Sequence, residues 1–330
     1  MKKIIVFFIL SLFISTGYAQ YINTSHKDAL EVKKRILLVG LPEDDKFLLE
    51  QYEQDSSEYV TLYKNDMEGQ RQALKEAALK YWEYTDSVVV FSLKEAKSLV
   101  KKFPEKYALM TFGEQFQDRY YVKNNNISNS PLVSWQKKDG KFSYNSGKRY
   151  SVKVLGITSL VIELPKKIFE IYLPKISPST GDFIFALKQI QYVLSSILKS
   201  EEGSANKLYR TINAKSEELK KKTLLIDARE VECKEDAVKK AYPYPFKIVN
   251  YEAIEDALKT KDDQYVLIQA VRFDTQNSSY YISSAANGEI YCNFIEPTFN
   301  YGQRNGAYSI IVLYPYINTK HLEKYGSGQQ

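Results

Sequence analysis

Short apolar runs alternate with stretches of helical periodicity through the first half of this chain. A β-branched run at Ile36–Val39 is followed by helical periodicity, a second apolar run at Val88–Ser92, a helical stretch at Leu93–Phe103 and a third run ending near Phe112. Strand, helix and strand in succession predict parallel strands that are joined by crossover helices.

The same succession recurs in the second half. Strands are predicted at Leu224–Ile226 and Phe246–Asn250, followed by a helix at Tyr251–Thr260 and a third strand ending near Val271. The two halves also align as sequences, and this indicates a tandem duplication. Four blocks match in one order: Ile36–Val39 with Thr223–Ile226, Val88–Phe112 with Phe246–Ala270, Asp139–Asn145 with Asn287–Asn293, and Leu173–Ser177 with Tyr314–Asn318.

Each copy changes its pattern after the third strand. Asp139-Gly140 and Asn287-Gly288 are dipeptides that favour a type I′ hairpin, so the second half of each copy is predicted to be antiparallel. The predicted fold class is therefore α/β (α+β mixed), a tandem duplication of a mixed parallel and antiparallel sheet domain flanked by helices.

The two copies are predicted to differ in their helices. The first copy has roughly 29 extra residues between its first two strands, with a predicted strand at Tyr59–Tyr63 and a helix at Met67–Trp82. The second copy has one helix there, at Cys233–Ala241. A Ser179-x-x-Asp182 start signal opens a long amphipathic helix at the end of the first copy. Its apolar stripe consists of Phe183, Leu187, Ile190, Leu194 and Ile197.

The second copy ends in a short helical stub at Thr319–Tyr325, and Ala205–Lys222 is predicted as a polar linker helix. The predicted boundaries are residues 1–19 for a cleaved signal peptide, 30–200 for the first copy, 201–221 for the linker and 222–326 for the second copy.

The N-terminus has the pattern of a secretory signal peptide. Lys2 and Lys3 precede a short apolar segment, and Gly17-Tyr18-Ala19 supplies a small-x-small cleavage site. The mature protein is predicted to begin at Gln20, in the periplasm or outside the cell. No later segment reaches about 18 apolar residues, so we expect a soluble mature chain without an integral membrane segment.

Composition narrows the classes of partner. Hydrophobic residues make up 44% of the 330 residues and charged residues 26%, which suffices for one or two cores. Without Lys2 and Lys3, 44 basic residues stand against 40 acidic ones, and this dispersed net charge near +4 does not predict nucleic-acid binding. The 27 Tyr and 16 Phe residues suit amphipathic strands as well as glycan or peptide surfaces.

The sequence offers little material for catalysis. Its two histidines, His26 and His321, are predicted to be surface residues, so a Ser-His or Cys-His pair is not expected. Closely spaced His and Cys ligands for zinc are absent from the sequence, and Gly40-Leu41-Pro42 lacks the repeated glycines of a phosphate loop. We assign no catalytic residue, no metal and no cofactor.

Carboxylates are the remaining chemical candidates. Asp227, Arg229 and Glu230 follow the strand Thr223–Ile226, at the edge where α/β sheets bind ligands, and Glu43–Asp45 has the matching place in the first copy. A pair of such acids could cleave a glycosidic bond. The favoured interpretation is structural, because acids at a helix start cap free amide groups.

Cys233 and Cys292 both lie in the second copy. Export to an oxidising compartment permits a disulfide between them, whereas the alternative is that both are buried free thiols.

The best candidate for a binding surface is the predicted loop Asn293–Gly306. It carries Phe299, Tyr301 and Arg304, and loops of this length inside a compact domain are often functional. Aromatic rings and a guanidinium suit sugars or extended peptides. The favoured alternative is that the loop folds back over the sheet edge.

We therefore predict an exported, non-catalytic envelope protein that binds a glycan, a peptide or a protein partner. Two alternatives stay open: a carboxylate-dependent envelope hydrolase, and a structural or assembly subunit of an envelope complex. A deep pocket joining Asp227 to another acid would favour the hydrolase, an open aromatic groove the binding protein, and a flat apolar face the assembly subunit.

Overall fold

The computed structural model describes most of the chain beyond the predicted signal peptide. It covers residues 20–22, 24–55, 57–115, 120–124, 148–152, 157–175, 177–199, 203–209, 212–273, 277–297, 299–304, 307–312 and 316–327. Residues 1–19 and the predicted Asp139-Gly140 turn lie outside the described residues.

The first copy is built on a six-stranded mixed sheet in the order β1-β8-β7-β4-β2-β3. Strands β3, β2 and β4 are parallel, whereas β4, β7, β8 and β1 pair antiparallel. The strands are β1 (Gln20–Ile22), β2 (Ile36–Leu41), β3 (Val88–Ser92), β4 (Tyr107–Gln115), β7 (Ile157–Glu163) and β8 (Lys167–Tyr172). The helices are α1 (His26–Lys33), α2 (Lys46–Asp55), α3 (Ser57–Tyr81), α4 (Leu93–Lys102) and α6 (Thr180–Leu198).

The second copy is built on a five-stranded sheet in the order β10-β9-β11-β12-β13. Its strands are β9 (Thr223–Asp227), β10 (Phe246–Val249), β11 (Tyr265–Arg272), β12 (Asn277–Ser284) and β13 (Ile290–Pro297). Its helices are α8 (Glu235–Ala241), α9 (Tyr251–Thr260) and α10 (Thr319–Ser327). The linker contains α7 (Ala205–Tyr209) and the 3-10 helix η1 (Ile212–Lys221).

Apart from β1, the two sheets have the same strand order and the same strand directions, which confirms the predicted tandem duplication. The parallel strands also share their register, and the paired residues are those that the sequence alignment equates. In the first sheet Ile36 pairs with Tyr107 and Leu37 with Val88; in the second sheet Thr223 pairs with Tyr265 and Leu224 with Phe246.

The antiparallel halves match in detail as well. The register shifts at the same point of each sheet, between Ile162 and Glu163 in β7 and between Ile282 and Ser283 in β12. A bulge that recurs at one position in two copies belongs to the shared architecture. Side-chain hydrogen bonds also occur at equivalent positions. Ser159 of β7 bonds to Glu170 of β8, and Ser279 of β12 bonds to Asn293 of β13.

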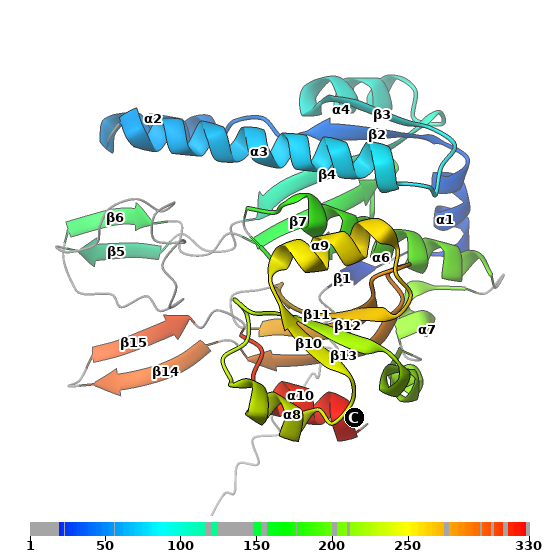
Figure 1. Cartoon of the computed structure of the whole chain (residues 1–330). Helices are drawn as coiled ribbons and strands as arrows, with labels where there is room; N and C mark the ends of the chain where they lie inside the picture. The colour runs from blue at the N-terminus through cyan, green and yellow to red at the C-terminus, as the bar shows by residue number, and fades with distance from the viewer. Residues whose placement is uncertain are drawn as a thin grey trace, which may run out of the picture.

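The two copies are stacked in the same orientation, so that layers of helices and the two sheets alternate through the molecule (Figure 1). Helix α4 covers one face of the first sheet, and α3 and α6 cover the other. In the second sheet α9 covers the face that corresponds to that of α4, and α8 and α10 cover the opposite face. Helix α6 packs against α9. The face of the first copy that carries α3 and α6 therefore lies against the face of the second copy that carries α9.

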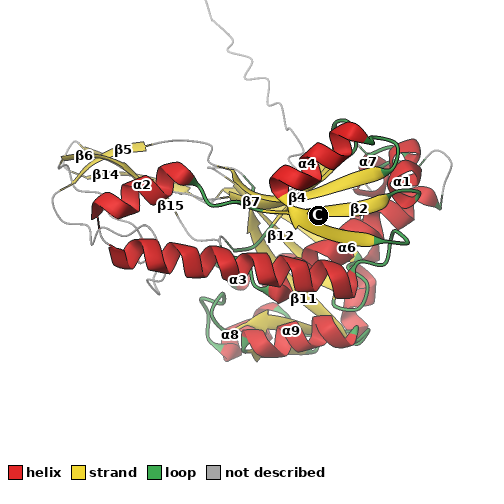
Figure 2. Cartoon of the chain, turned by 90° about the horizontal axis from the view of Figure 1, so that it is seen from above, coloured by secondary structure: helices red, strands yellow, loops and turns green. Residues whose placement is uncertain are grey.

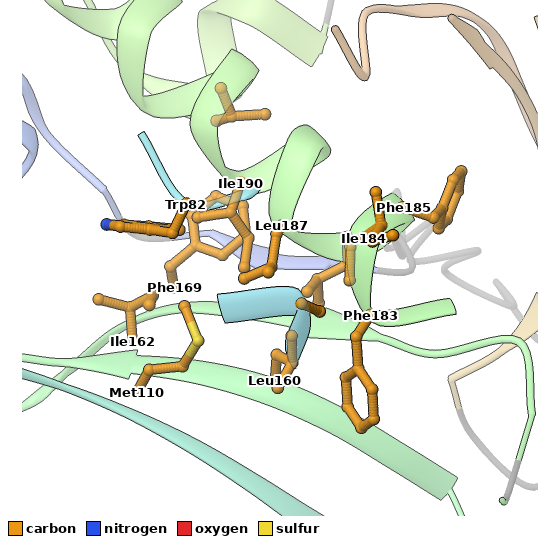
Figure 3. Close-up of a cluster of buried hydrophobic side chains, with 14 of the residues drawn as sticks. Trp82, Met110, Leu160, Ile162, Phe169, Phe183, Ile184, Phe185, Leu187 and Ile190 are labelled. Carbon is orange, nitrogen blue, oxygen red and sulfur yellow. The ribbon is translucent and has the colours of Figure 1, made fainter. Parts of the chain in front are cut away.

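Helix α6 forms the core of the molecule because it packs on both copies. Phe183 meets Phe112 of the first sheet edge to face, with 5.3 Å between the ring centroids, and Phe185 stacks on Tyr281 of the second sheet at 5.7 Å. Figure 3 shows Phe183 and Leu187 of α6 directed toward Leu160 in the first sheet, whereas Phe185 points away from it. The predicted apolar stripe of this helix is buried throughout.

Lys188 and Gly288 bring α6 into close contact with the second copy. The buried Lys188 donates hydrogen bonds from Nζ to the carbonyl oxygens of Leu258 and Ala285, at 2.5 and 2.6 Å. Burial lowers the pKa of Lys188 to about 8. Gly288 has a φ of +75°, and a Cβ atom there would lie 2.4 Å from the carbonyl carbon of Lys188.

Each copy carries one additional hairpin that joins neither main sheet. Strands β5 (Tyr120–Asn124) and β6 (Lys148–Val152) are inserted between β4 and β7. Strands β14 (Phe299–Arg304) and β15 (Ala307–Val312) are inserted between β13 and α10. Figures 1 and 2 both place the two hairpins beside each other at one end of the molecule, next to α2.

The predicted strand at Tyr59–Tyr63 is wrong, because this segment lies within the single helix α3. Tyr63 packs against Tyr52 of α2 with 5.6 Å between ring centroids, and Val60 and Met67 join the same cluster. The spacing of Val60, Tyr63 and Met67 places them on one face of a helix, and this packing outweighs the β propensity of the short run.

The alignment of Asp139–Asn145 with Asn287–Asn293 is also wrong. The turn at Asn287 joins β12 to β13, and its equivalent in the first copy is the turn between β7 and β8, at Leu164–Lys166. Asp139 falls between β5 and β6, within an insertion that the second copy has at a different place. Among the described residues, Lys261 alone has a positive φ without being glycine, so the Asn287-Gly288 turn is not type I′.

Candidate functional site

The predicted ligand residues Asp227 and Arg229 form a tight ion pair at the carboxyl end of β9. Asp227 is buried, and its Oδ1 accepts a hydrogen bond from the backbone N–H of Arg229 at 2.9 Å. The guanidinium Nη2 of Arg229 lies 2.6 Å from Asp227 Oδ2. A carboxylate held by both the backbone and the side chain of one neighbour is fixed in position.

The first copy contributes residues to this site from α6 and from the segment that precedes it. Lys175 Nζ lies 3.3 Å from the buried Asp182 Oδ1 and 3.2 Å from the ring centroid of Tyr251, the first residue of α9. The guanidinium carbon of Arg229 lies 4.8 Å from the same ring centroid. Two cations, one from each copy, therefore contact a single aromatic ring.

The local sequence explains why the starts of α6 and α9 approach each other so closely. Ser179 caps α6, and Asp182 accepts hydrogen bonds from the backbone N–H of Ser179 at 2.9 Å and from its hydroxyl at 2.9 Å, as the Ser-x-x-Asp signal predicts. Ser179 Oγ also lies 2.8 Å from the hydroxyl of Tyr251. A Cβ atom at Gly181 would lie 2.7 Å from that hydroxyl, so the contact requires glycine.

Glu230 adds a third acid to this site. It is 8% exposed, and burial raises its pKa to about 7, with Asp227 and Asp182 acting in the same direction and Lys175 against it. Glu230 therefore changes its charge near neutral pH. We name the whole group the junction cluster; it comprises Lys175, Ser179, Asp182, Asp227, Arg229, Glu230 and Tyr251.

The junction cluster pairs its own charges and connects the two copies. The structural interpretation of Asp227 as a helix cap is wrong, because α8 begins only at Glu235, with Lys234 at its N-cap. In the first copy, Asp44 forms an ion pair with Arg71 of α3, and Asp45 precedes the first residue of α2. Of the two predicted acid clusters, Glu43–Asp45 is therefore the one that lies at a helix start.

The predicted loop residues Phe299, Tyr301 and Arg304 lie in strand β14, so the prediction of a 14-residue loop at Asn293–Gly306 is wrong. Strand β13 continues to Pro297, and β14 pairs with β15 in regular antiparallel register. Turn-forming residues in this segment obscured its strand pattern. The chain that returns from this hairpin bonds to the segment after Asp227, where the backbone N–H of Ile317 donates to the carbonyl oxygen of Glu230 at 2.7 Å.

The register divides each hairpin into two faces of different composition. In β14 and β15, Tyr301 pairs with Ile310 and Phe299 with Val312, whereas Arg304 falls on the opposite face with Asn300. In β5 and β6, one face carries Tyr120, Val122, Asn124, Lys148, Tyr150 and Val152. The other face of β5 and β6 carries Tyr121, Lys123, Arg149 and Ser151. One face of each hairpin is therefore mostly aromatic and β-branched, with Gln303 on that face of β14 and β15 and with Asn124 and Lys148 on that of β5 and β6.

The prediction that His321 lies on the surface is wrong. Its side chain is 2% exposed beneath Tyr280, with 3.9 Å between the ring centroids, and Nε2 lies 2.8 Å from Glu296 Oε2. The N-cap residue Asn318 donates its backbone N–H to Nδ1 at 3.2 Å, which assigns the proton to Nε2. Burial lowers the pKa of His321, partly offset by Glu296. His26 is half-buried at the start of α1.

Cys233 and Cys292 are both free thiols, so the disulfide that the sequence permits is not present. Cys292 is buried in the core of the second copy, where burial raises the pKa of its thiol to about 12, and Cys233 packs at the edge of that core. Both residues fill apolar space, which is the alternative that the sequence left open.

Sequence patterns did not single out Lys175, Tyr251 or Lys188. The burial of Lys188 could have been suspected from the sequence, because this lysine directly follows Leu187, a residue of the apolar stripe of α6. Lys175 and Tyr251 carry no local signal, because they meet only through the stacking of the two copies.

Among the described residues, no group of three or more His, Cys, Asp and Glu side chains is placed to hold a metal ion. Over the same part of the chain, every helix is too short or too polar to cross a bilayer. Comparison of the chain with protein families, with curated proteins and with solved structures gives no match.

Proposed function

We propose that this chain is an exported, non-catalytic binding protein of the cell envelope that binds a partner protein through its two hairpins. One observation carries the proposal. The two copies share their sheet topology, each departs from it by one inserted hairpin, and the two insertions lie at the same end of the molecule although they occur at different points of the fold.

The composition of the hairpins supports a protein as the partner. A two-stranded hairpin is marginally stable in water on its own, and one face of each of these hairpins is mostly aromatic and β-branched. Burial of such a face against another protein stabilises both the hairpin and the complex.

The position of β1 supports export. Strand β1 begins at Gln20, the residue that follows the predicted cleavage site, and Gln20 pairs with Ile171 of β8. The junction cluster supports a scaffold role for the remainder of the molecule, because Asp182 pairs with Lys175, Asp227 pairs with Arg229, and both cations contact the ring of Tyr251.

The proposal is tested by site-specific photocrosslinking in intact cells. A photoreactive residue replaces Tyr301 in β14 or Tyr150 in β6, and a matched variant carries it at the exposed Lys240 of α8. We expect both hairpin positions to give the same protein adduct and Lys240 to give none. Adducts of the same size at all three positions, or no protein adduct at either hairpin position, would contradict the proposal.

A deletion variant separates binding from folding. Replacement of residues 299–312 by a short Gly-Ser connection should abolish the adduct at Tyr150 and leave the thermal unfolding of the body unchanged, because β14 and β15 pair with no strand of either main sheet. An adduct that persists in this variant would show that the two hairpins do not act together.

A further inference from the structure

Strand β3 is an open edge of the first sheet. It pairs with β2 on one side, and within the described part of the chain no strand pairs with its other side. The hydrogen bond from Leu37 N to Ser87 O fixes the alternation, since in a parallel pair every second residue bonds to the neighbour. Val88 and Val90 therefore turn their backbone N–H and C=O groups away from β2.

This edge lacks the features that usually prevent strand addition. Proteins protect edge strands with lysine, proline or bulges, and β3 has the sequence VVVFS in unbroken register. Val89 is 37% exposed. The equivalent edge strand of the second copy, β10, has Lys247 at the position of Val89, and the Lys247 ammonium lies over the ring of Tyr265. The edge strand of the second copy is therefore protected against strand addition by a lysine, whereas the edge strand of the first copy is not.

The surroundings of β3 are basic. Helix α4 follows the strand directly and exposes Lys94, Lys97, Lys101 and Lys102. Two acids on this side are engaged: Glu95 caps α4 through Ser92, and Glu105 lies 3.4 Å from Arg35. Asp86 precedes the strand and is exposed. Phe103, at the end of α4, is 43% exposed and adds apolar surface beside the lysines.

We infer that β3 accepts an extended, acidic peptide segment of a partner protein as an added strand. Backbone hydrogen bonds along the edge supply the pairing, and glutamate or aspartate side chains of the peptide complement the lysines of α4. A second copy of this chain would bring four lysines against four lysines, so charge disfavours pairing between two β3 strands. The site is separate from the hairpins and does not rest on their proposed function.

The inference is tested with synthetic peptides and the mature full chain. The probe is a fluorescein-labelled peptide of alternating valine and threonine with two glutamates at each end, and its counterpart carries lysines in their place. A third peptide has the acidic sequence with N-methyl groups on alternate residues. Fluorescence anisotropy should show binding of the acidic peptide, binding at least tenfold weaker for the lysine peptide, and a loss of affinity with salt.

The N-methylated peptide tests the pairing mode without changing the protein. It keeps every side chain and charge but cannot donate along one edge, so we expect at least a tenfold loss of affinity. Undiminished binding of this peptide would overturn strand addition. Failure of the acidic peptide to bind would overturn the site.

Protein variants locate the site. Val89→Lys introduces the residue that the second copy has at this position and should weaken binding of the acidic peptide at least tenfold. The matched control is Leu79→Lys, which adds the same charge at an exposed apolar residue of α3 and should leave binding unchanged. Equal losses in both variants, or a free chain that dimerises until Val89→Lys separates it, would overturn the inference.

Discussion

At Gly288 the backbone conformation and the space around it both require glycine. The φ of +75° is unfavourable for other residues, and a Cβ atom would press on the backbone of α6 at Lys188. Gly288→Ala should therefore lower the free energy of unfolding by more than about 2 kcal/mol in urea titrations. Gly69→Ala is the control: this helical residue has open space around it, and alanine there should stabilise α3 by about 0.5–1 kcal/mol. Equal effects of the two changes would contradict this account.

Glu230 should make stability depend on pH. Its folded-state pKa of about 7 exceeds the unfolded value of about 4.3, so the folded chain binds the proton more tightly between these values. The free energy of unfolding should therefore fall as pH rises from about 4.5 to 7, by up to about 1.4 kcal/mol per pH unit from this group. Glu230→Gln should remove that part of the slope. Chemical denaturation across this pH range measures it, and identical slopes would refute the role of Glu230.

Residues that act across the junction were the least predictable from sequence. The ion pair of Asp227 and Arg229 is local, and the sequence placed both at the correct strand end. Their neighbours Lys175 and Asp182 lie more than forty residues earlier, in another copy, and no periodicity encodes that meeting. His321 was misplaced for the same reason, because its burial depends on Tyr280 and Glu296.

Among the elements, the equivalent helices α4 and α9 begin with the same device. The Ser92 side chain accepts a hydrogen bond from Glu95 N, and the Asn250 side chain accepts one from Ala253 N. Ser92→Ala and Asn250→Ala should each lower the free energy of unfolding by about 1 kcal/mol, measured by chemical denaturation. Ser98→Ala, at an exposed interior position of α4, serves as the control and should change stability by less than about 0.5 kcal/mol.

Elements with strong periodicity could be predicted, and those that depend on insertions could not. The strands and helices from Val88 to Phe112 and from Phe246 to Ala270 match the predicted order and register, because buried parallel strands have continuous apolar sequences. Strand β14 was predicted as part of a loop, since Gly302 and Asn300 weaken the strand pattern. The linker was predicted as one helix, but it consists of the short α7 and the 3-10 helix η1.

For the whole molecule, the position of α6 makes the second copy dependent on the first. Leu267, Val271 and Tyr281 of the second sheet belong to the same apolar cluster as α6. A fragment that spans residues 212–327 lacks this helix and should expose that face. We expect it to bind a hydrophobic dye and to melt without a cooperative transition, whereas the mature full chain should unfold in one step. A sharp thermal transition of the fragment in calorimetry would contradict this dependence.

The head-to-tail stacking of the copies has a consequence for assembly. A repeat that packs its inner face on the outer face of the next has no inherent end, so solenoid proteins stop growth with terminal repeats whose outer surface is polar. Helix α4 occupies that terminal position. Where its equivalent α9 places Tyr251 and Glu255 next to Gly181 of the preceding copy, α4 has Leu93 and Lys97, and Lys97 belongs to a row of exposed lysines. The lysines thus act as the cap of a two-unit array, and a third unit could be added at this end only if they were replaced.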